Sequence, residues 1–307
     1  MGGLHIILDK KLKEEAVSKE VLAQLDELLD ILFRSLQSSG EILGNLCLTR
    51  EVDKSAARET VACMLLELLT IDYVSKNLSV TRWEQLGWSF TEQNEIVRRS
   101  IVSSYSTIIQ TTALHIRYLA YSCLIASDDK SYKAIEKCML FALNRFRCTH
   151  DDLIGKAMEY EDRKLIGLAE NVIPECIVPY CMYLLCHAPV CSGEENRSKA
   201  VAESIRFIYN CLRSSLRQGS DNMSYLIQQV NLLSSRYRDH NATDERSLMM
   251  VTRVADQILN DSIKTVENVQ PFKGNISIPT ELFEYRSGNG EKILTSDKSM
   301  KVQSRVK

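Results

Sequence analysis

The sequence predicts an all-α protein in which antiparallel helix pairs stack into an α-solenoid. Apolar residues recur every three or four positions over most of the 307 residues, and no segment alternates with the period of two that is typical of strands. Only 12 glycines and 5 prolines interrupt the chain, which favours helix. Helix pairs are expected near Thr91, Ser131 and Pro174, and this spacing of about 40 residues suits two-helix repeats. A closed helical bundle stays open as an alternative, because it produces a similar string of helices.

An amphipathic helix is predicted within residues 12–38. Its apolar face carries Val21, Leu25, Leu28, Leu32 and Leu36. Serines and a glycine at positions 38–40 begin a break that continues to Val52. We therefore expect this helix to be separate from a helical repeat domain at residues 53–265, and residues 1–11 to be flexible.

The first half of the repeat domain contains several helix starts. Asp53 or Ser55 is expected to cap a helix, because either side chain can accept hydrogen bonds from the first backbone N–H groups. Thr81 is expected to cap a short helix, and Thr91 begins a helix of about five turns. A further helix is predicted from Ala113 to Ala126.

The second half continues the helical pattern. A helix that follows Ser131 is expected to stop before Thr149 or Asp151, either of which can cap the next one. Three more stripes predict helices along 205–216, 223–233 and 248–259. Beyond Lys264 the periodicity ends, so residues 266–290 are expected to form an irregular extension and residues 291–307 a disordered basic tail.

The most distinctive segment runs from Pro174 to Pro189. It is apolar on every side and ends Leu184-Leu185-Cys186-His187-Ala188-Pro189. Proline is tolerated in the first turn of a helix but cannot continue one, so this helix is expected to begin and end within about four turns. A helix that is apolar all round must be buried between other helices.

Composition and motifs argue against several function classes. The formal net charge of −2 gives no basic footprint for nucleic acid, and the two apolar runs are interrupted by charged residues or proline, so no membrane span is expected. Cys176, Cys181, Cys186 and Cys191 are spaced five residues apart. Each such step rotates a helix by about 140°, so the four thiols cannot converge on one metal ion. No cofactor is expected.

One surface feature is a candidate for partner binding. It is a cluster of basic residues: Arg145, Arg147, Lys156, Arg163 and Lys164. A solvated helix end is the simpler interpretation. If the cluster is functional, its arginine forks would bind an acidic peptide or an anionic head group.

Ordered pieces of the chain resemble a known family. They are Leu119-Ala120-Tyr121 with Ala126 and Asp128, Ala134–Cys138, Pro174–Tyr180, Leu184–Pro189, Cys211-Leu212, Asn222 with Ser224, Val254-Ala255-Asp256, Ile278-Pro279 and Leu282-Phe283. From about Ala56 to Phe283 the chain is similar to the C-terminal part of the family of precocious dissociation of sisters protein five, the HEAT-repeat regulators of cohesin. Cys176 and Cys186 stand where the family has tyrosine and alanine.

The resemblance implies a HEAT-like repeat fold and a nuclear, chromatin-associated, non-enzymatic scaffold for sister chromatid cohesion. Its partners would be proteins, namely the kleisin subunit of cohesin and the factors that release or protect cohesin. Their peptide segments would lie in grooves between repeats. The alternatives are an unrelated helical-repeat adaptor and an all-helical metal-dependent enzyme or enzyme subunit.

Overall fold

The computed structural model of the chain describes residues 19–41, 49–126, 129–188, 194–216, 222–241, 245–263, 272 and 275–286. Helices account for most of these residues, which confirms the predicted all-α class. The α-helices are α2 (Lys19–Gln37), α3 (Glu51–Leu68), α4 (Asp72–Asn77), α5 (Val80–Trp88), α6 (Glu95–Thr111), α7 (Ile116–Leu119), α8 (Ser122–Ile125), α9 (Asp129–Tyr160), α10 (Arg163–Glu170), α11 (Ile177–His187), α12 (Glu194–Ser214), α13 (Met223–Arg236) and α14 (Arg246–Ile263). Two 3₁₀ turns, η2 (Ser89–Thr91) and η3 (Pro174–Cys176), and two strands, β1 (Tyr237–Asp239) and β2 (Phe283–Tyr285), complete the described part.

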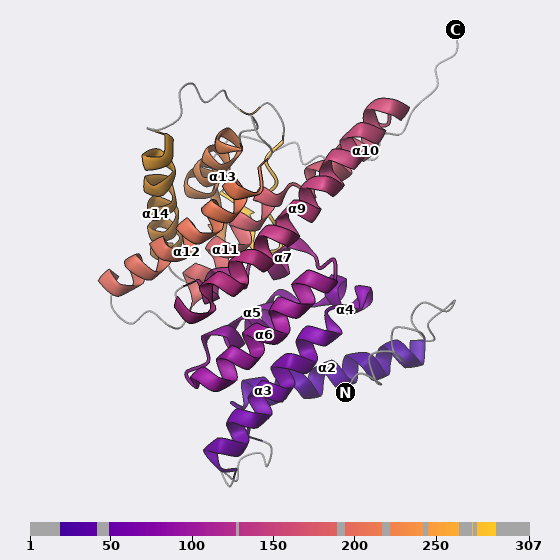
Figure 1. Ribbon diagram of the computed structural model, residues 1–307, viewed down its shortest axis with the longest axis vertical. Coiled ribbons are helices and arrows are strands. Elements are labelled where there is room, and N and C mark those ends of the chain that lie inside the picture. The colour runs from indigo at the N-terminus through magenta and orange to yellow at the C-terminus, as the bar shows by residue number, and fades with distance from the viewer. Residues whose placement is uncertain are drawn as a thin grey trace.

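The long helix α9 lies between two groups of helices (Figure 1). On one side α3 packs against α6, and α6 packs against α9. On the other side α9 contacts α12, which contacts α14, and α14 packs against α13 and α11. The last turns of α9 project from the body together with α10, which runs back along them.

The predicted burial of the proline-bounded helix is confirmed. Every residue from Ile177 to Cys186 in α11 is buried, and Pro174 begins the 3₁₀ turn that leads into this helix. The helix lies against aromatic side chains from the first half of the chain. The ring of Trp83 on α5 lies 5.9 Å from that of Tyr180 and 6.0 Å from that of Tyr183. The helix α11 is apolar on all sides, and it is surrounded by other parts of the protein on all sides.

The helix expected from Ala113 to Ala126 is broken into α7 and α8 at Ala120 and Tyr121. The break frees backbone carbonyl groups inside the core. The hydroxyl of Tyr105, on α6, donates to the carbonyl oxygens of Tyr118 at 2.8 Å and Leu119 at 3.2 Å. Because these buried carbonyls have a partner, the kink is compatible with a dry interior.

Two predicted helix caps are wrong by a few residues. The N-cap of α5 is Ser79 rather than Thr81, and its side chain accepts a hydrogen bond from the Arg82 N–H. The N-cap of α6 is Asn94, whereas Thr91 lies in the preceding 3₁₀ turn. In each case the capping residue is the one whose backbone is extended, and this depends on where the chain must turn.

The start of α3 also differs from the prediction. The helix begins at Glu51, with Arg50 at the N-cap, so Asp53 and Ser55 lie inside the first turns. The Arg50 guanidinium donates to the Asp53 carboxylate at 2.7 Å instead. A carboxylate in the first turn of a helix interacts favourably with the positive end of the helix dipole. An acidic residue near a helix start can have this role or that of a cap, and its position in the sequence does not distinguish the two.

The helix after Ser131 does not stop before Thr149. Instead, α9 continues without interruption to Tyr160, so the expected capping roles of Thr149 and Asp151 are wrong. The Thr149 hydroxyl donates to the Arg145 carbonyl within the helix at 3.0 Å. No glycine or proline lies near Thr149 to interrupt α9. The helix also packs against α10 and α12, and these contacts favour its continuation over a cap at Thr149 or Asp151.

The sequence suggested a separate helix at residues 12–38, but α2 packs on α3 and α5 within the shared core. Its buried residues are Leu25, Leu29, Leu32 and Phe33. Gly40 follows at φ +82°, and a Cβ at this position would lie 2.4 Å from the Lys54 carbonyl oxygen of α3. Only glycine allows this close approach between the turn and α3. Residues 1–18 are outside the described part.

Part of the region expected to be an irregular extension is ordered against the core. Strand β2 pairs antiparallel with β1, with Tyr237 opposite Tyr285 and Asp239 opposite Phe283. Ile278, Leu282 and Phe283 are buried. No period-two pattern predicted these three-residue strands, because they are too short to show one. The expected basic tail at residues 291–307 lies outside the described residues.

Candidate functional site

The five basic residues singled out in the sequence do not form one surface. Arg145 and Arg147 lie near the middle of α9 and point toward neighbouring elements. Nη2 of Arg145 donates to the carbonyl oxygen of Thr112 at 2.5 Å and to that of Ile109 at 3.4 Å. It therefore satisfies carbonyls at the C-terminal end of α6, where the helix itself offers no donor.

Arg147 belongs to a buried polar node. Its Nη2 donates to the carboxylate of Glu175 at 2.5 Å, and its Nε donates to the hydroxyl of Ser215 at 3.1 Å. Glu175 is only 1 % exposed and also accepts a hydrogen bond of 2.6 Å from the side-chain amide of Asn222. The node joins α9, η3 and the loop between α12 and α13. The hydrogen-bond donors of Arg147 therefore stabilise the fold and do not face a partner.

Lys156, Arg163 and Lys164 are exposed on the projecting hairpin of α9 and α10. The ammonium group of Lys156 donates to the carboxylate of Asp152 at 2.7 Å. The acidic residues of the hairpin outnumber its basic ones: they are Asp151, Asp152, Glu159, Glu161, Asp162 and Glu170. A mixed-charge hairpin is less suited to an acidic peptide than the linear sequence suggested, and partner binding at these three basic residues stays a prediction.

An apolar groove lies between α2 and α3. It has a volume of about 840 Å³ and is lined by Ile31, Leu32, Arg34, Ser35, Ser38, Glu41, Asp53, Ala56, Ala57, Thr60 and Val61. Ile31 is 53 % exposed although it is a large apolar side chain. Small residues on α3 keep the groove open, because Ala56 and Ala57 fill little of the space between the helices. A groove of this size can hold several side chains of a bound peptide.

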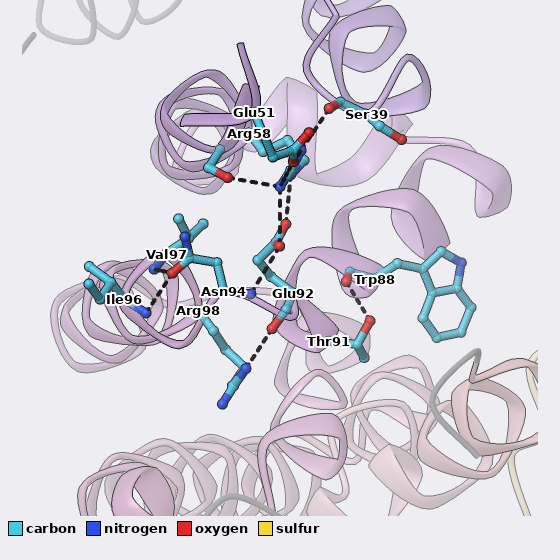
Figure 2. Close-up of polar contacts among 11 residues, drawn as sticks. Ser39, Glu51, Arg58, Trp88, Thr91, Glu92, Asn94, Ile96, Val97 and Arg98 are labelled. Atoms are coloured by element: carbon cyan, nitrogen blue, oxygen red, sulfur yellow. Dashed lines mark hydrogen bonds and ion pairs between the residues drawn. The ribbon is translucent and has the colours of Figure 1, made fainter. Parts of the chain in front are cut away.

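A network of polar contacts is centred on Arg58 of α3 (Figure 2). The guanidinium donates to the Glu92 carboxylate, with Nε 2.7 Å from Oε2, and to the carbonyl oxygen of Ser39 at 2.8 Å. It also reaches the carboxylate of Glu51 at 3.3 Å and the hydroxyl of Ser55 at 3.1 Å. One side chain of α3 thus connects the turn after α2 to the loop before α6.

Glu92 is the second centre of the network. Its carboxylate accepts the backbone N–H of Asn94 at 3.2 Å, and its carbonyl oxygen accepts a hydrogen bond from Arg98 at 2.5 Å. Burial by itself would raise the pKa of this carboxyl group, but the hydrogen bonds from Arg58 and from the Asn94 N–H bring the pKa below its ordinary value. Glu92 is therefore ionised at neutral pH.

The groove escaped the sequence analysis because its walls come from two helices separated by a break. The only local signals are Ile31, which lies off the apolar stripe of Leu25, Leu28 and Leu32, and the adjacent small residues Ala56 and Ala57. Neither signal is specific. Exposed isoleucines and alanine pairs are common on helices that bind nothing.

The cysteine-rich helix offers no reactive thiol among the described residues. Burial raises the pKa of Cys176 to about 11, and it raises the pKa of Cys181 and of Cys186 well above the ordinary value, so these thiols are protonated at neutral pH. Within the described ranges, no three His, Cys, Asp or Glu side chains are placed to hold a metal ion. Cys191 lies outside these ranges.

No single helix in the described part is both long enough and apolar enough to cross a bilayer. The bent pair formed by α10 and the segment Pro174–His187 reaches the required length and composition only jointly, with a bend of 48°. The second member of this pair contains α11, which lies in the protein core.

Comparison with protein families identifies a match that covers most of the chain. The family model for sister chromatid cohesion protein PDS5 matches residues 3–284. The matched range includes every helix of the described part and most of β2. No sequence match to a curated protein is found.

Proposed function

This chain belongs to the PDS5 family of sister chromatid cohesion proteins, and on that premise we propose that it is a non-enzymatic scaffold that regulates cohesin by binding peptide segments of partner proteins. The observation that carries the proposal is the extent of the family match, which runs from residue 3 to residue 284 of 307. A match of this length involves the whole helical body rather than one shared motif.

The proposed scaffold is a HEAT-like solenoid. The order of helix contacts, from α3 through α6, α9 and α12 to α14, supports this arrangement, because each helix lies next to the following member of the series. In such a stack the grooves between neighbouring helices present apolar floors and polar rims to extended or helical peptides.

We place one binding position in the groove between α2 and α3. Apolar anchor residues of a partner would contact Ile31 and Val61, and the polar side chains of Ser35, Ser38 and Thr60 would set the register at the rim. The proposed partners are the kleisin subunit of cohesin and the factors that release or protect cohesin, and the proposed location is chromatin in the nucleus.

The proposal is tested by co-purification of kleisin with the tagged full-length chain from cells that contain cohesin. Two groove variants, Ile31→Glu and Thr60→Trp, are expected to lower the recovered kleisin about tenfold or more, because the first places a charge on the apolar wall and the second fills the groove. Ile96→Glu is the matched control, since Ile96 is 77 % exposed on α6 and does not line the groove.

Each outcome has a distinct meaning. Recovery of kleisin that is equal in all variants would place the contact elsewhere on the chain. Repeated failure to recover kleisin, together with consistent recovery of another protein, would contradict the proposed function and favour a different helical-repeat adaptor.

A further inference from the structure

A second groove runs between α12 and α14. It consists of two adjoining hollows of about 530 and 410 Å³, which share Ser198, Val254 and Gln257 in their walls. The two helices pack directly against each other, although about 50 residues separate their starting points. Neither the basic cluster of α9 nor the groove between α2 and α3 contributes to this surface.

Arginine side chains dominate the charge of this groove. Arg197, Arg246 and Arg253 line the larger hollow, and Arg206 lines the smaller one. Among the described residues of the two linings, Asp261 carries the only carboxylate. The whole chain has a formal net charge of −2, so this excess of positive charge is local to the groove.

Two of these arginines have no partner among the described residues. Arg206 and Arg253 are exposed and make no hydrogen bond or ion pair with any residue in the described part of the chain. Arg197 differs, because its Nη2 donates to the carbonyl oxygen of Cys186 at 2.6 Å and to the hydroxyl of Ser247 at 3.2 Å. The groove thus combines one anchored arginine with at least two whose donors are open to a ligand.

The floor between the arginines is apolar. Met249 is 50 % exposed, and Met250 and Val254 lie beside it in the same lining. On α14 the residues Arg246, Met249, Met250 and Arg253 follow a helical stripe, and Arg246 and Arg253 are two turns apart, or about 10.5 Å along the axis. Methionine side chains adapt to apolar groups of different shape.

We propose that this groove binds an acidic segment of a partner protein, with carboxylates on Arg206 and Arg253 and an apolar side chain seated on Met249, about one turn before Arg253 on α14. About three residues of an extended peptide span the distance between the two arginine levels of α14. The inference rests on the proposed function and deepens it, because it states the chemistry of one partner segment.

A protein segment fits the groove better than a nucleic acid. Nucleic-acid binding relies on many phosphate contacts from a strongly basic domain, whereas this groove offers four arginines on a protein of net negative charge. The exposed methionine floor has no role in phosphate binding. It does suit the apolar residue of an acidic peptide.

The test selects ligands from a random 16-residue peptide display library on the full-length chain. Enriched peptides are expected to be acidic with at least one apolar residue beside the carboxylates. Their affinity, measured by fluorescence anisotropy, should fall at least about tenfold for the double variant Arg206→Glu, Arg253→Glu, because the charge contacts become repulsive. Met249→Ser should also weaken binding, which checks the apolar seat independently.

The matched control is Lys199→Glu, Arg213→Glu, which makes the same change in net charge on exposed positions of α12 outside the groove lining. This control should bind the peptides like the unmodified chain. Circular dichroism melts should be the same for all variants, since none of the four charged residues has a side-chain partner in the described part.

Three results would overturn the inference: enrichment of neutral or basic peptides, enrichment that is equal on the Arg206→Glu, Arg253→Glu variant, or binding of a 30-base-pair DNA duplex that this variant abolishes. Co-purification of kleisin separates this inference from the proposed function. If the double variant still recovers kleisin and selects the same peptides, the scaffold function stands and the acidic-segment site fails.

Discussion

His187 on the buried helix α11 donates a hydrogen bond from Nε2 to the Asp239 carboxylate of strand β1, with 2.7 Å between Nε2 and Oδ2. This contact joins the core helix to the two-stranded sheet. Asp239 is buried and also accepts the backbone N–H of Asn241 at 2.8 Å. The pair is therefore a titratable link between two parts of the fold that are far apart in the sequence.

The hydrogen bond with Asp239 raises the pKa of His187 above its ordinary value, against the opposing effect of burial. A raised pKa means that the folded state binds the proton more tightly. The stabilisation is fully present below the unfolded pKa of about 6.5 and is lost as pH rises through the folded pKa. The free energy of unfolding of the unmodified chain should exceed that of Asp239→Asn by more at pH 6 than at pH 9. Urea denaturation measures this difference.

Any change to the Asn241 hydrogen bond in Asp239→Asn is the same at both pH values, so only the pH-dependent part of the difference reports on His187. A difference that does not change between pH 6 and pH 9 would show that the imidazole gains nothing from Asp239. An NMR titration of the His187 ring protons provides the direct control.

Arg147→Met should destabilise the fold by about 3–5 kcal/mol, because it leaves the buried carboxylate of Glu175 without its cation. Arg163→Met, at an exposed position, should change the free energy of unfolding by no more than about 0.5 kcal/mol. Both values come from urea denaturation. Adding Glu175→Gln to Arg147→Met should recover part of the loss, and no recovery would mean that the node acts through packing alone.

Glu92→Gln should remove an acid-sensitive contribution to stability. The pKa of Glu92 is lowered in the folded state, so its contribution is present above the unfolded pKa of about 4.3 and is lost as pH falls through the folded pKa. At pH 7 the variant should be less stable by about 2 kcal/mol, the scale of a hydrogen bond to a charged group. The two proteins should converge at low pH in thermal melts, and an equal difference at pH 7 and pH 3 would contradict this assignment.

Tyr105→Phe should cost about 1–3 kcal/mol, because it removes the hydroxyl that donates to the Tyr118 and Leu119 carbonyls between α7 and α8. Tyr160→Phe is the matched control, since Tyr160 is 67 % exposed at the end of α9. Hydrogen exchange of the α8 backbone amides gives a second measurement. Faster exchange in Tyr105→Phe alone would show that the hydroxyl stabilises the kink, whereas unchanged exchange would show that it does not.

Helix content and the buried helix could be predicted from local sequence. The apolar stripes of α3, α6 and α12 match a period of 3.6, and α11 has no polar side, so burial was its only stable arrangement. These features depend on residues within a few turns of each other. The family resemblance likewise came from short ordered pieces, and the match over residues 3–284 confirms it.

Helix boundaries could not be predicted to the residue. Thr91 and Asn94 are both good caps, and the choice between them depends on where η2 packs on α6. Thr149 and Asp151 have the chemistry of caps, yet α9 passes through them. A capping side chain stabilises a helix end by about 1 kcal/mol, which the packing of two further helical turns exceeds.

The candidate surfaces depended entirely on how the helices come together. Arg145 and Arg147 look like surface charges in the sequence, but they satisfy carbonyls and a carboxylate from α6 and η3. Arg206 and Arg253 share a groove although they are 47 positions apart in the chain. The spacing of apolar residues along the sequence determines which face of a helix is apolar, because it depends on that helix alone. Which helix covers that face, and which charges are left without a partner, follows from the free energy of the whole packed assembly.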